Sequence, residues 1–296
     1  MTQQRKMMLE ELQRRNYSQL TAEAYLRAMK GFVKHFHRAP EQLTQDHIRE
    51  YQAYLFRERK LSSNTVSQHV SALRFFYVKT LKRPYLPDEI PFPKQRGRLP
   101  IILSQEEVTR LIDCAANPLH RAMLMTLYST GVRRSELVKL KVSDIDSQRM
   151  VIHVYQGKGN RDRDVQLSER LLAELRDYWR WMRPGTYLFP GYENYRRTDV
   201  PISAKAVWHA CRQAAKRAGI DKKLSPHSLR HSYATHQLEA GADLASVQNL
   251  LGHADVRDTM IYLHLSKRHL QRAPNPLDRL DFAPPTFTKR AQRRMK

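Results

Sequence analysis

The sequence predicts a mainly helical α+β protein of two domains. Apolar residues recur at helical spacing through most of the chain, one β-rich segment interrupts them, and a proline-containing basic stretch divides the sequence. The 296 residues, 41% of them hydrophobic, are enough for two ordinary cores. We expect an N-terminal helical domain over 1–83, a linker over 84–100, a larger domain over 101–270 and a basic tail over 271–296.

The N-terminal domain is expected to be a small helical bundle, because three stretches carry apolar stripes behind residues that favour helix N-termini. The helices are expected to begin near Thr21, Thr44 and Ser63. Their apolar faces are Tyr25, Met29, Phe32, Val33 and Phe36; Ile48, Tyr51 and Leu55; and Val66, Val70, Leu73 and Tyr77.

The linker is marked by Pro84, Pro87, Pro91, Pro93 and Pro100. Each proline removes a backbone donor and disfavours helix at the preceding residue. One interpretation is a disordered spacer. The other is a basic strap that lies along a phosphate backbone.

The second domain is expected to open with a helix, because Ser104 and Glu107 have the spacing of a capping box. The helical pattern is then interrupted once, by a β-rich run over 150–155, a turn over 157–160 and a return strand over 164–167. These segments predict a hairpin with Lys158 at its tip. Ser168 is expected to cap a helix whose apolar face is Leu171, Leu172, Leu175, Trp179 and Met182. Further helices are expected over 204–218, 228–240 and 244–251.

The charge balance points to a polyanionic partner. There are 52 Lys+Arg and 29 Asp+Glu, so the formal net charge is 52 − 29 = +23. Such a surface attracts nucleic acid and makes binding salt-dependent. The candidate contacts with the DNA backbone are Arg74, Lys79, Lys94, Arg96 and Arg98.

A membrane partner is disfavoured, because the sequence has no apolar run of the roughly 20 residues that span a bilayer and no signal segment at its start. We therefore expect a soluble intracellular protein. Cys114 and Cys211 lie in apolar helical patterns without metal-type pairing, so both are expected to be core residues.

The second half contains side chains suited to chemistry on a phosphodiester. Tyrosine supplies a hydroxyl nucleophile, provided that its proton is removed or nearby cations lower its pKa from near 10. Guanidinium forks can hold the non-bridging phosphate oxygens, histidines can donate or move protons, and a lysine can protonate the leaving 5′ oxygen. These candidates are Tyr262, Arg133, Arg230, His227, His253 and Lys158.

Each candidate also has a plainer interpretation when taken alone. Tyr262 lies between apolar neighbours and is typical of a core aromatic, and Arg133 has the spacing of a surface ion pair with Glu136. Arg230 suits a structural ion pair, and Lys158 suits an ordinary phosphate contact.

His227 and His231 share a helix face and raise the alternative of zinc. Arg230 would place a cation beside that metal, no Glu follows His227, and Pro226 indicates that the helix only starts there. No metal site is therefore expected.

The stretches around these residues resemble the tyrosine recombinase (phage-type integrase) family. The resemblance runs from about residue 21 to about 269, is strongest over 103–264, and depends on five motifs in the right order. They are Thr-Gly-Val-Arg-Arg-Ser-Glu-Leu at 130–137, Gly-Lys-Gly-Asn at 157–160, His-Ser-Leu-Arg-His at 227–231, Leu-Gly-His at 251–253 and Ile-Tyr at 261–262.

The resemblance implies an N-terminal helical core-binding (SAM-like) domain and a C-terminal catalytic domain that clamp duplex DNA. It selects Arg133 over Arg134 as the catalytic arginine, supports Lys158 as general acid, and leaves Glu136 to orient Arg133 or a histidine. It further implies a 3′-phosphotyrosine intermediate, a Holliday junction, four protomers on paired inverted half-sites, no metal, no ATP and no cofactor. A C-terminal segment would dock on a neighbouring protomer.

The chain is similar to both the Xer and the integron-integrase branches. Asp255-Val256 and Thr259-Met260-Ile261 favour the latter, but the sequence has no extra insertion between Lys158 and His227. We expect a bacterial cytoplasmic, nucleoid-associated enzyme of mobile-element integration and excision or of dimer resolution, with accessory proteins as possible partners. The alternatives are a non-catalytic DNA-binding accessory factor and a type IB topoisomerase-like enzyme. The motifs do not encode the recombination site, because base readout depends on side-chain placement in the grooves.

Overall fold

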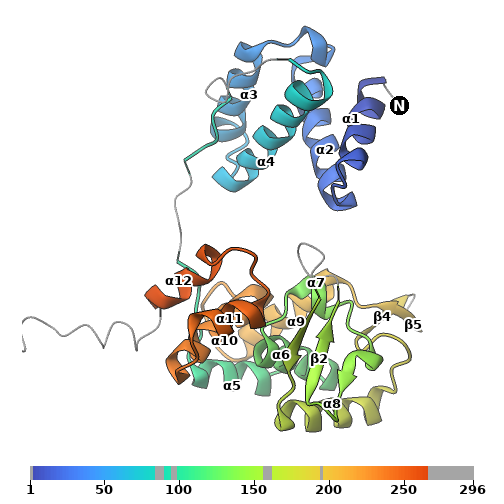
Figure 1. The fold of residues 1–296 in the computed structure, drawn as a ribbon, viewed down its shortest axis with the longest axis vertical. Helices are drawn as coiled ribbons and strands as arrows, with labels where there is room; N and C mark the ends of the chain where they lie inside the picture. The colour runs from blue at the N-terminus through green and yellow to red at the C-terminus, as the bar shows by residue number, and fades with distance from the viewer. Residues whose placement is uncertain (1–2, 84–89, 95–98, 156–161, 194–195, 266–296) are drawn as a thin grey trace, which may run out of the picture. The chain divides into compact units, whose positions relative to one another are not determined.

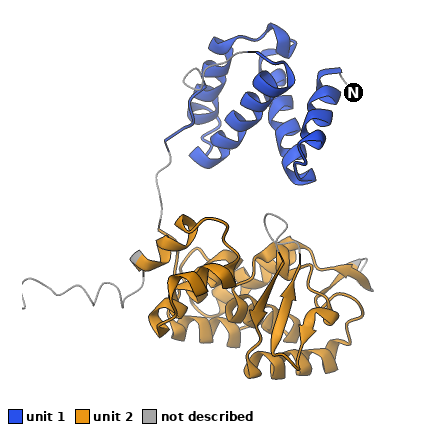
Figure 2. Cartoon of the chain, in the orientation of Figure 1, with its two compact units in different colours: residues 1–98 blue, residues 99–296 orange. Residues whose placement is uncertain are grey.

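The chain divides into two compact units, unit 1 (residues 1–98) and unit 2 (residues 99–296), coloured separately in Figure 2. The structure is a computed structural model and describes residues 3–83, 90–94, 99–155, 162–193 and 196–265 (Figure 1). The described residues are mostly helical, with two small antiparallel sheets, which confirms the predicted fold class. Among them, no helix is long and apolar enough to cross a membrane.

Unit 1 is a bundle of helices around one core. The helices are α1 (Gln3–Arg14), α2 (Gln19–Phe36), α3 (Gln45–Arg57) and α4 (Ser63–Arg74), and a π-helical turn (Phe75–Thr80) continues α4. Helix α1 was not predicted. Helix α2 begins slightly before the predicted start near Thr21, because Ser18 provides the N-cap hydroxyl, whereas α4 begins at the predicted Ser63 behind the N-cap Ser62. The predicted stripes supply most of the core, including the fully buried Phe32, Ile48 and Val66.

Part of the linker packs onto unit 1, so the disordered-spacer interpretation is wrong for these residues. Ile90 is 1% exposed and belongs to the core of unit 1. The Arg74 Nε donates to the Ile90 carbonyl at 2.8 Å, and its guanidinium lies 4.3 Å from the centre of the Phe92 ring. Gln52 donates to the Pro91 carbonyl at 3.0 Å. These contacts hold residues 90–92 against α3 and α4.

Unit 2 contains the remaining helices and both sheets. Its helices are α5 (Gln105–Asp113), α6 (Pro118–Thr130), α7 (Arg134–Leu137), α8 (Glu169–Met182), α9 (Ala204–Arg217), α10 (Pro226–Ala240), α11 (Leu244–Leu251) and α12 (Arg257–Leu265). The first sheet has the order β1 (Ile145–Asp146), β2 (Val151–Val154), β3 (Arg163–Gln166), with Val154 opposite Arg163. The predicted capping box of Ser104 and Glu107, the Ser168 cap and the hairpin strands are present, whereas the predicted turn over 157–160 lies outside the described residues.

Three expectations for unit 2 are corrected. The helical pattern yields twice rather than once, because β4 (Pro190–Glu193) and β5 (Arg196–Pro201) form a second antiparallel pair. Trp179 is 39% exposed instead of packing in the α8 stripe, and the Arg183 guanidinium lies 4.6 Å from the centre of its ring. Cys211 is buried as expected, but Cys114 is only half-buried at the end of α5.

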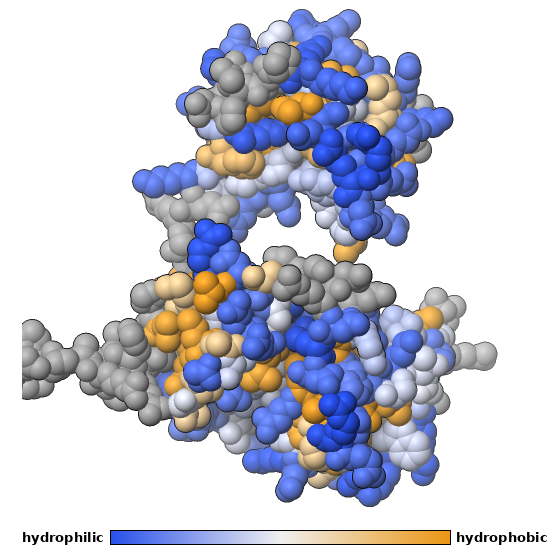
Figure 3. Space-filling model, in the orientation of Figure 1, coloured by the Kyte–Doolittle hydropathy of each residue, from blue (hydrophilic) through white to orange (hydrophobic). Residues whose placement is uncertain are grey.

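Helix α10 is the central element of unit 2, in contact with α6, α9, α11 and α12. Its buried side chains contribute to the main hydrophobic core of unit 2 and to a smaller hydrophobic cluster, which includes Tyr233, Leu238, Val247, Leu251 and Tyr262. Gly131 ends α6 in a left-handed conformation at φ +63°, and a Cβ there would lie 2.5 Å from the Tyr233 ring. The visible face of each unit is dominated by hydrophilic side chains, with smaller hydrophobic patches (Figure 3).

We expect Ile90→Ala to loosen unit 1 selectively. Truncating a buried isoleucine costs about 2 kcal/mol or more, which lowers the protection of core amides against hydrogen exchange by a factor of about 30. The measurement is hydrogen exchange of the full chain, read separately for peptides of α2 to α4 and of α6 to α10. Lys94→Ala, an exposed change in the same segment, is the control. Unaltered protection of unit 1 in Ile90→Ala would show that the segment merely rests on the bundle.

Candidate active site

A buried carboxylate shared by two arginines forms the centre of the site. Glu136, at the start of α7, is 5% exposed. Its Oε1 accepts from Arg133 Nη1 at 2.7 Å and its Oε2 accepts from Arg163 Nη2 at 2.7 Å. The same carboxylate caps α7 by accepting from the Arg133 backbone N–H at 2.8 Å. Burial alone would raise the pKa of Glu136, but the hydrogen bonds and charges of Arg163 and Arg133 outweigh it and lower the pKa to about 2.

The second predicted arginine is held by the ends of two helices. Arg230 is 3% exposed on α10, and it donates to the carbonyls of Gly131 at 2.6 Å and Leu251 at 2.7 Å. Arg133 likewise donates to the Gly252 carbonyl at 3.0 Å. Burial and the nearby Arg133 lower the pKa of Arg230 to about 10, so the group remains charged at neutral pH. Three guanidinium groups gathered around one carboxylate leave this place positive and suited to an anion.

Tyr262 lies beside these cations, with its hydroxyl bonded to a histidine. The side chain is 2% exposed, and its hydroxyl lies 2.9 Å from His231 Nδ1. The Tyr262 ring is stacked on that of His253 at a centroid distance of 6.3 Å, and His253 Nδ1 lies 2.8 Å from the hydroxyl of the buried Thr259. Burial raises the pKa of Tyr262, while the charge of Arg230 opposes that rise. The phenol is therefore protonated at neutral pH.

The histidines of the site are neutral at neutral pH. Burial lowers the pKa of His231 to about 4, with His227 and Arg230 adding to the shift. Burial and the charges of Arg230 and Arg133 also lower the pKa of His253 to about 4. The pKa of His227 is lowered by partial desolvation and by Arg230, although its side chain is largely exposed. A neutral imidazole can accept a proton as well as donate one, as proton transfer requires.

Five of the predicted catalytic residues therefore come together from α7, α10, α12 and the loop after α11. They are Arg133, His227, Arg230, His253 and Tyr262. Lys158 lies outside the described residues, as do Arg96 and Arg98. Lys79 and Lys94 are exposed on unit 1, and the Arg74 guanidinium is engaged with Ile90 and Phe92. No group of three or more His, Cys, Asp or Glu side chains that could hold a metal ion occurs among the described residues.

Sequence reasoning did not identify Arg163, Thr259 or the role of His231. Arg163 is the first residue of β3, and its partners Glu136 and Leu250 are 27 and 87 residues away. His231 was considered only as a metal ligand, while its partner Tyr262 is 31 residues away. The available signals were the position of Arg163 just after the Gly-Lys-Gly-Asn motif and the second histidine of the His-Ser-Leu-Arg-His motif.

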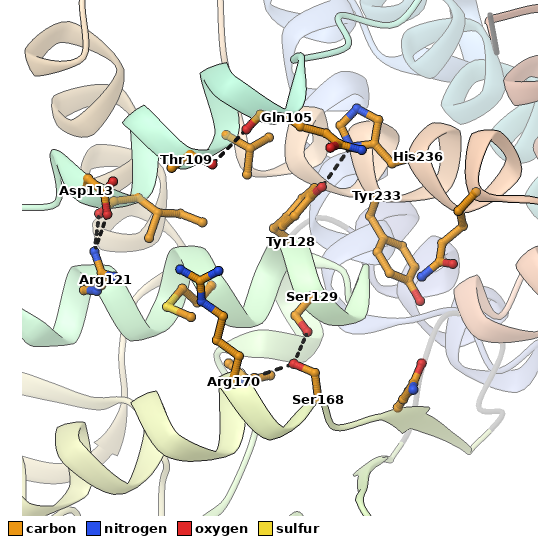
Figure 4. Close-up of a pocket in the computed structure, with 17 residues that line it drawn as sticks. Gln105, Thr109, Asp113, Arg121, Tyr128, Ser129, Ser168, Arg170, Tyr233 and His236 are labelled. Atoms are coloured by element: carbon orange, nitrogen blue, oxygen red, sulfur yellow. Dashed lines mark hydrogen bonds and ion pairs between the residues drawn. The ribbon is translucent and has the colours of Figure 1, made fainter. Parts of the chain in front are cut away.

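A separate pocket of about 500 Å³ lies on unit 2 between α5, α6, α8 and α10 (Figure 4). Its wall includes Tyr128, whose hydroxyl lies 2.8 Å from His236 Nδ1, and Tyr233, which also packs on Gly131. None of the predicted catalytic residues lines this pocket. This pocket is therefore distinct from the cluster of arginines around Tyr262.

Two family models match the chain. The model of the phage integrase family matches residues 102–269, and that of the N-terminal SAM-like domain of phage integrases matches residues 5–86. A putative integrase/recombinase of Sinorhizobium fredii is 45% identical over 287 residues, covering 97% of this chain and 92% of that protein. The tyrosine recombinase XerD of Listeria innocua is 35% identical over 269 residues, covering 85% of this chain and 90% of that protein.

A solved structure shares the fold. A lambda integrase tetramer bound to a Holliday junction has a TM-score of 0.69 and 19% identity, and the match covers 86% of this chain and 74% of that one. The expected pair of domain types therefore agrees with both the family models and the solved structure.

Unit 2 is expected to lose stability as the pH falls from 7 to 5. Imidazoles of the unfolded chain titrate near pH 6.5, whereas His231 and His253 bind protons only near pH 4 when folded. The unfolded state therefore binds more protons in this range, and the stability present above pH 6.5 is progressively lost, by at most about 2 kcal/mol for each histidine at pH 5. Glu136 titrates below this window.

The measurement is urea unfolding followed by tryptophan fluorescence, because Trp179, Trp181 and Trp208 all lie in unit 2. His253→Gln should flatten the dependence on pH, and the exposed His209→Gln should leave it as in the parent. Equal slopes for the parent and His253→Gln would contradict the buried neutral imidazole.

Proposed function

The chain belongs to the phage integrase family, the tyrosine recombinases, and we propose that unit 2 cuts and rejoins DNA with Tyr262 as the nucleophile. The chain is a site-specific recombinase, a DNA strand-exchanging enzyme. One observation supports these roles: the Tyr262 hydroxyl lies beside a cluster of arginines that share the Glu136 carboxylate. The family match favours recombination over the accessory-factor and topoisomerase-like alternatives.

In the proposed reaction, Tyr262 Oη attacks the phosphorus of a DNA phosphodiester. The new Oη–P bond replaces the P–O5′ bond, so the strand ends in a 3′-phosphotyrosine and a free 5′ hydroxyl. Arg133 and Arg230 neutralise the charge that grows on the non-bridging oxygens, because guanidinium groups already fixed in place need no reorganisation. His227 and His253 donate hydrogen bonds to the phosphate or accept the phenolic proton.

Lys158 is proposed to protonate the leaving 5′ oxygen, although this residue lies outside the described part of the chain. The phosphotyrosine retains the energy of the phosphodiester. A 5′ hydroxyl from a second strand can therefore reverse the reaction without ATP. No metal or cofactor takes part in the proposed steps.

The nucleophile has to leave its present environment before it can attack. Tyr262 is 2% exposed and its hydroxyl is bonded to His231, so a phosphodiester cannot reach it as it stands. Helix α12 carries Tyr262 and contacts α10 and α11. We infer that a shift of α12 on DNA exchanges the His231 hydrogen bond for contact with the phosphate.

The substrate is proposed to be duplex DNA with paired inverted half-sites, bound by a homotetramer that passes through a Holliday junction. The net charge of +23 supports binding to the backbone. Lys79 and Lys94 of unit 1, with Arg96 and Arg98 of the linker, would contact the DNA backbone. Arg74 would contact it only through guanidinium atoms that are not engaged with Ile90 and Phe92. The biological setting is proposed to be mobile-element integration and excision, or dimer resolution, in the nucleoid of a bacterial cytoplasm. Accessory proteins and docking of the C-terminal segment on a neighbour belong to the same proposal.

A trapping experiment tests the nucleophile. Nicked duplex DNA from the neighbourhood of the protein's own gene lets the cleaved product diffuse away, so a covalent adduct accumulates. The adduct should form in EDTA with the parent chain and be absent with Tyr262→Phe, which removes only the hydroxyl. DNA affinity should stay within about threefold, because Tyr262 acts on the reacting phosphate only.

Tyr128→Phe is a matched control, since Tyr128 also bonds a histidine of α10 through its hydroxyl, at 2.8 Å. It should form the adduct at the parental rate. An adduct in Tyr262→Phe would refute the assignment, and relaxation of a plasmid without a recombination site would favour the topoisomerase-like alternative.

A further inference from the structure

We propose that Arg163 is a positioning residue of the recombination site, which keeps Arg133 available for the phosphate and sets the place of His253. This inference rests on the proposed function. It concerns a residue outside the set of the nucleophile, the two clamping arginines, the histidines and the lysine.

Arg163 uses all three guanidinium nitrogens to join separate elements. Nη2 and Nη1 donate to the two oxygens of Glu136 at 2.7 and 3.1 Å, a bidentate pair. Nε donates to the Leu250 carbonyl near the end of α11 at 3.0 Å. The side chain is 10% exposed. One side chain therefore links β3 to the start of α7 and to the end of α11.

The first consequence concerns the charge of Arg133. Glu136 divides its single negative charge between Arg163 and Arg133, so neither guanidinium is fully neutralised. Without Arg163 the carboxylate would face Arg133 alone, and the resulting ion pair would compete with the DNA phosphate. Arg163 thus preserves the positive potential that Arg133 presents to an anion.

The second consequence concerns the segment before His253. Arg163 packs against Gly252, where an added Cβ would lie 3.0 Å from its Cδ and 3.2 Å from its Nε, and where φ is +62°. The Gly252 carbonyl accepts from Arg133, and His253 follows directly. The Leu250 and Gly252 contacts therefore fix the backbone from which His253 reaches the site.

Lysine cannot replace Arg163 in this role. A single ammonium group lacks the planar fork that reaches both Glu136 oxygens and the Leu250 carbonyl together. Both Arg163→Ala and Arg163→Lys should therefore slow single-turnover cleavage of the nicked duplex by about 100-fold, with DNA affinity changed less than about threefold. Tryptophan fluorescence during urea unfolding selects conditions in which each variant is folded.

Arg149→Ala is the matched control, because Arg149 pairs with Asp164 next to Arg163 but is 66% exposed. It should cleave within about twofold of the parent. Cleavage at the parental rate by folded Arg163→Ala would overturn the inference, and so would full rescue by Arg163→Lys. A loss of DNA affinity in place of a loss of rate would make Arg163 a DNA-binding residue instead.

A double-mutant cycle tests whether Arg163 acts through Glu136. Glu136→Gln is expected to slow cleavage, and adding Arg163→Ala should then slow it by about tenfold, less than the about 100-fold in the parent, because the shared contact is already gone and only the Leu250 and Gly252 contacts are still lost. If the two substitutions slowed cleavage by independent factors that multiply, Arg163 would not act through Glu136.

A readout without DNA cleavage separates this inference from the proposed function. A missing Tyr262-dependent adduct in the parent would defeat the function itself. Calorimetric titration with inorganic phosphate then tests the role of Arg163 by itself. The affinity for phosphate should fall about tenfold in Arg163→Ala and stay unchanged in Arg149→Ala. Equal phosphate affinity of the parent and Arg163→Ala would overturn the inference.

Discussion

The site depends on one buried carboxylate that is shared by two guanidinium groups. Burying Glu136 unpaired would cost several kcal/mol, and the same holds for an arginine without acceptors. The two arginines and the backbone N–H of Arg133 satisfy the carboxylate, and carbonyls at the ends of α6 and α11 accept from Arg230 and Arg133. This arrangement retains excess positive charge inside the protein, which is stable because every cation is hydrogen-bonded.

The environment of Tyr262 differs from that of the other histidine-bonded tyrosine of unit 2 in its charges. Two tyrosines of unit 2 bond histidines of α10 through their hydroxyls, Tyr262 with His231 and Tyr128 with His236. Of these two, Tyr262 has the charge of Arg230 opposing the effect of burial on its pKa, whereas at Tyr128 the charge of Glu239 adds to that effect. The two tyrosines therefore differ in their neighbouring charges and not in the histidine contact, and the proposed function assigns the role of nucleophile to Tyr262 alone.

Local features of the fold could be predicted from the sequence, whereas contacts between distant segments could not. The caps of α5 and α8 depend on residues three positions apart, so Ser104 and Ser168 identified both helix starts. The β4–β5 pair was missed because Pro190–Glu193 and Arg196–Pro201 lack an alternating apolar pattern. Ile90 was missed because its burial depends on the core of unit 1, to which residues far earlier in the sequence contribute. Arg133 and Arg230 were found through their motifs, but the carbonyls that orient them became visible only in three dimensions.

The glycine-terminated helices also bear on the synthesis of the protein. The carbonyl of Gly252 accepts from Arg133 across 119 residues of sequence, and that of Gly131 accepts from Arg230 across 99. Ribosomes add about 5–20 residues per second, so a growing chain exposes Arg133 several seconds before α11 and α12 exist. A nascent or prematurely terminated chain can bind nucleic acid through its basic surface but lacks the assembled anion site and the tyrosine. On the proposed function, the order of the segments thus withholds DNA breakage until α12 has been synthesised.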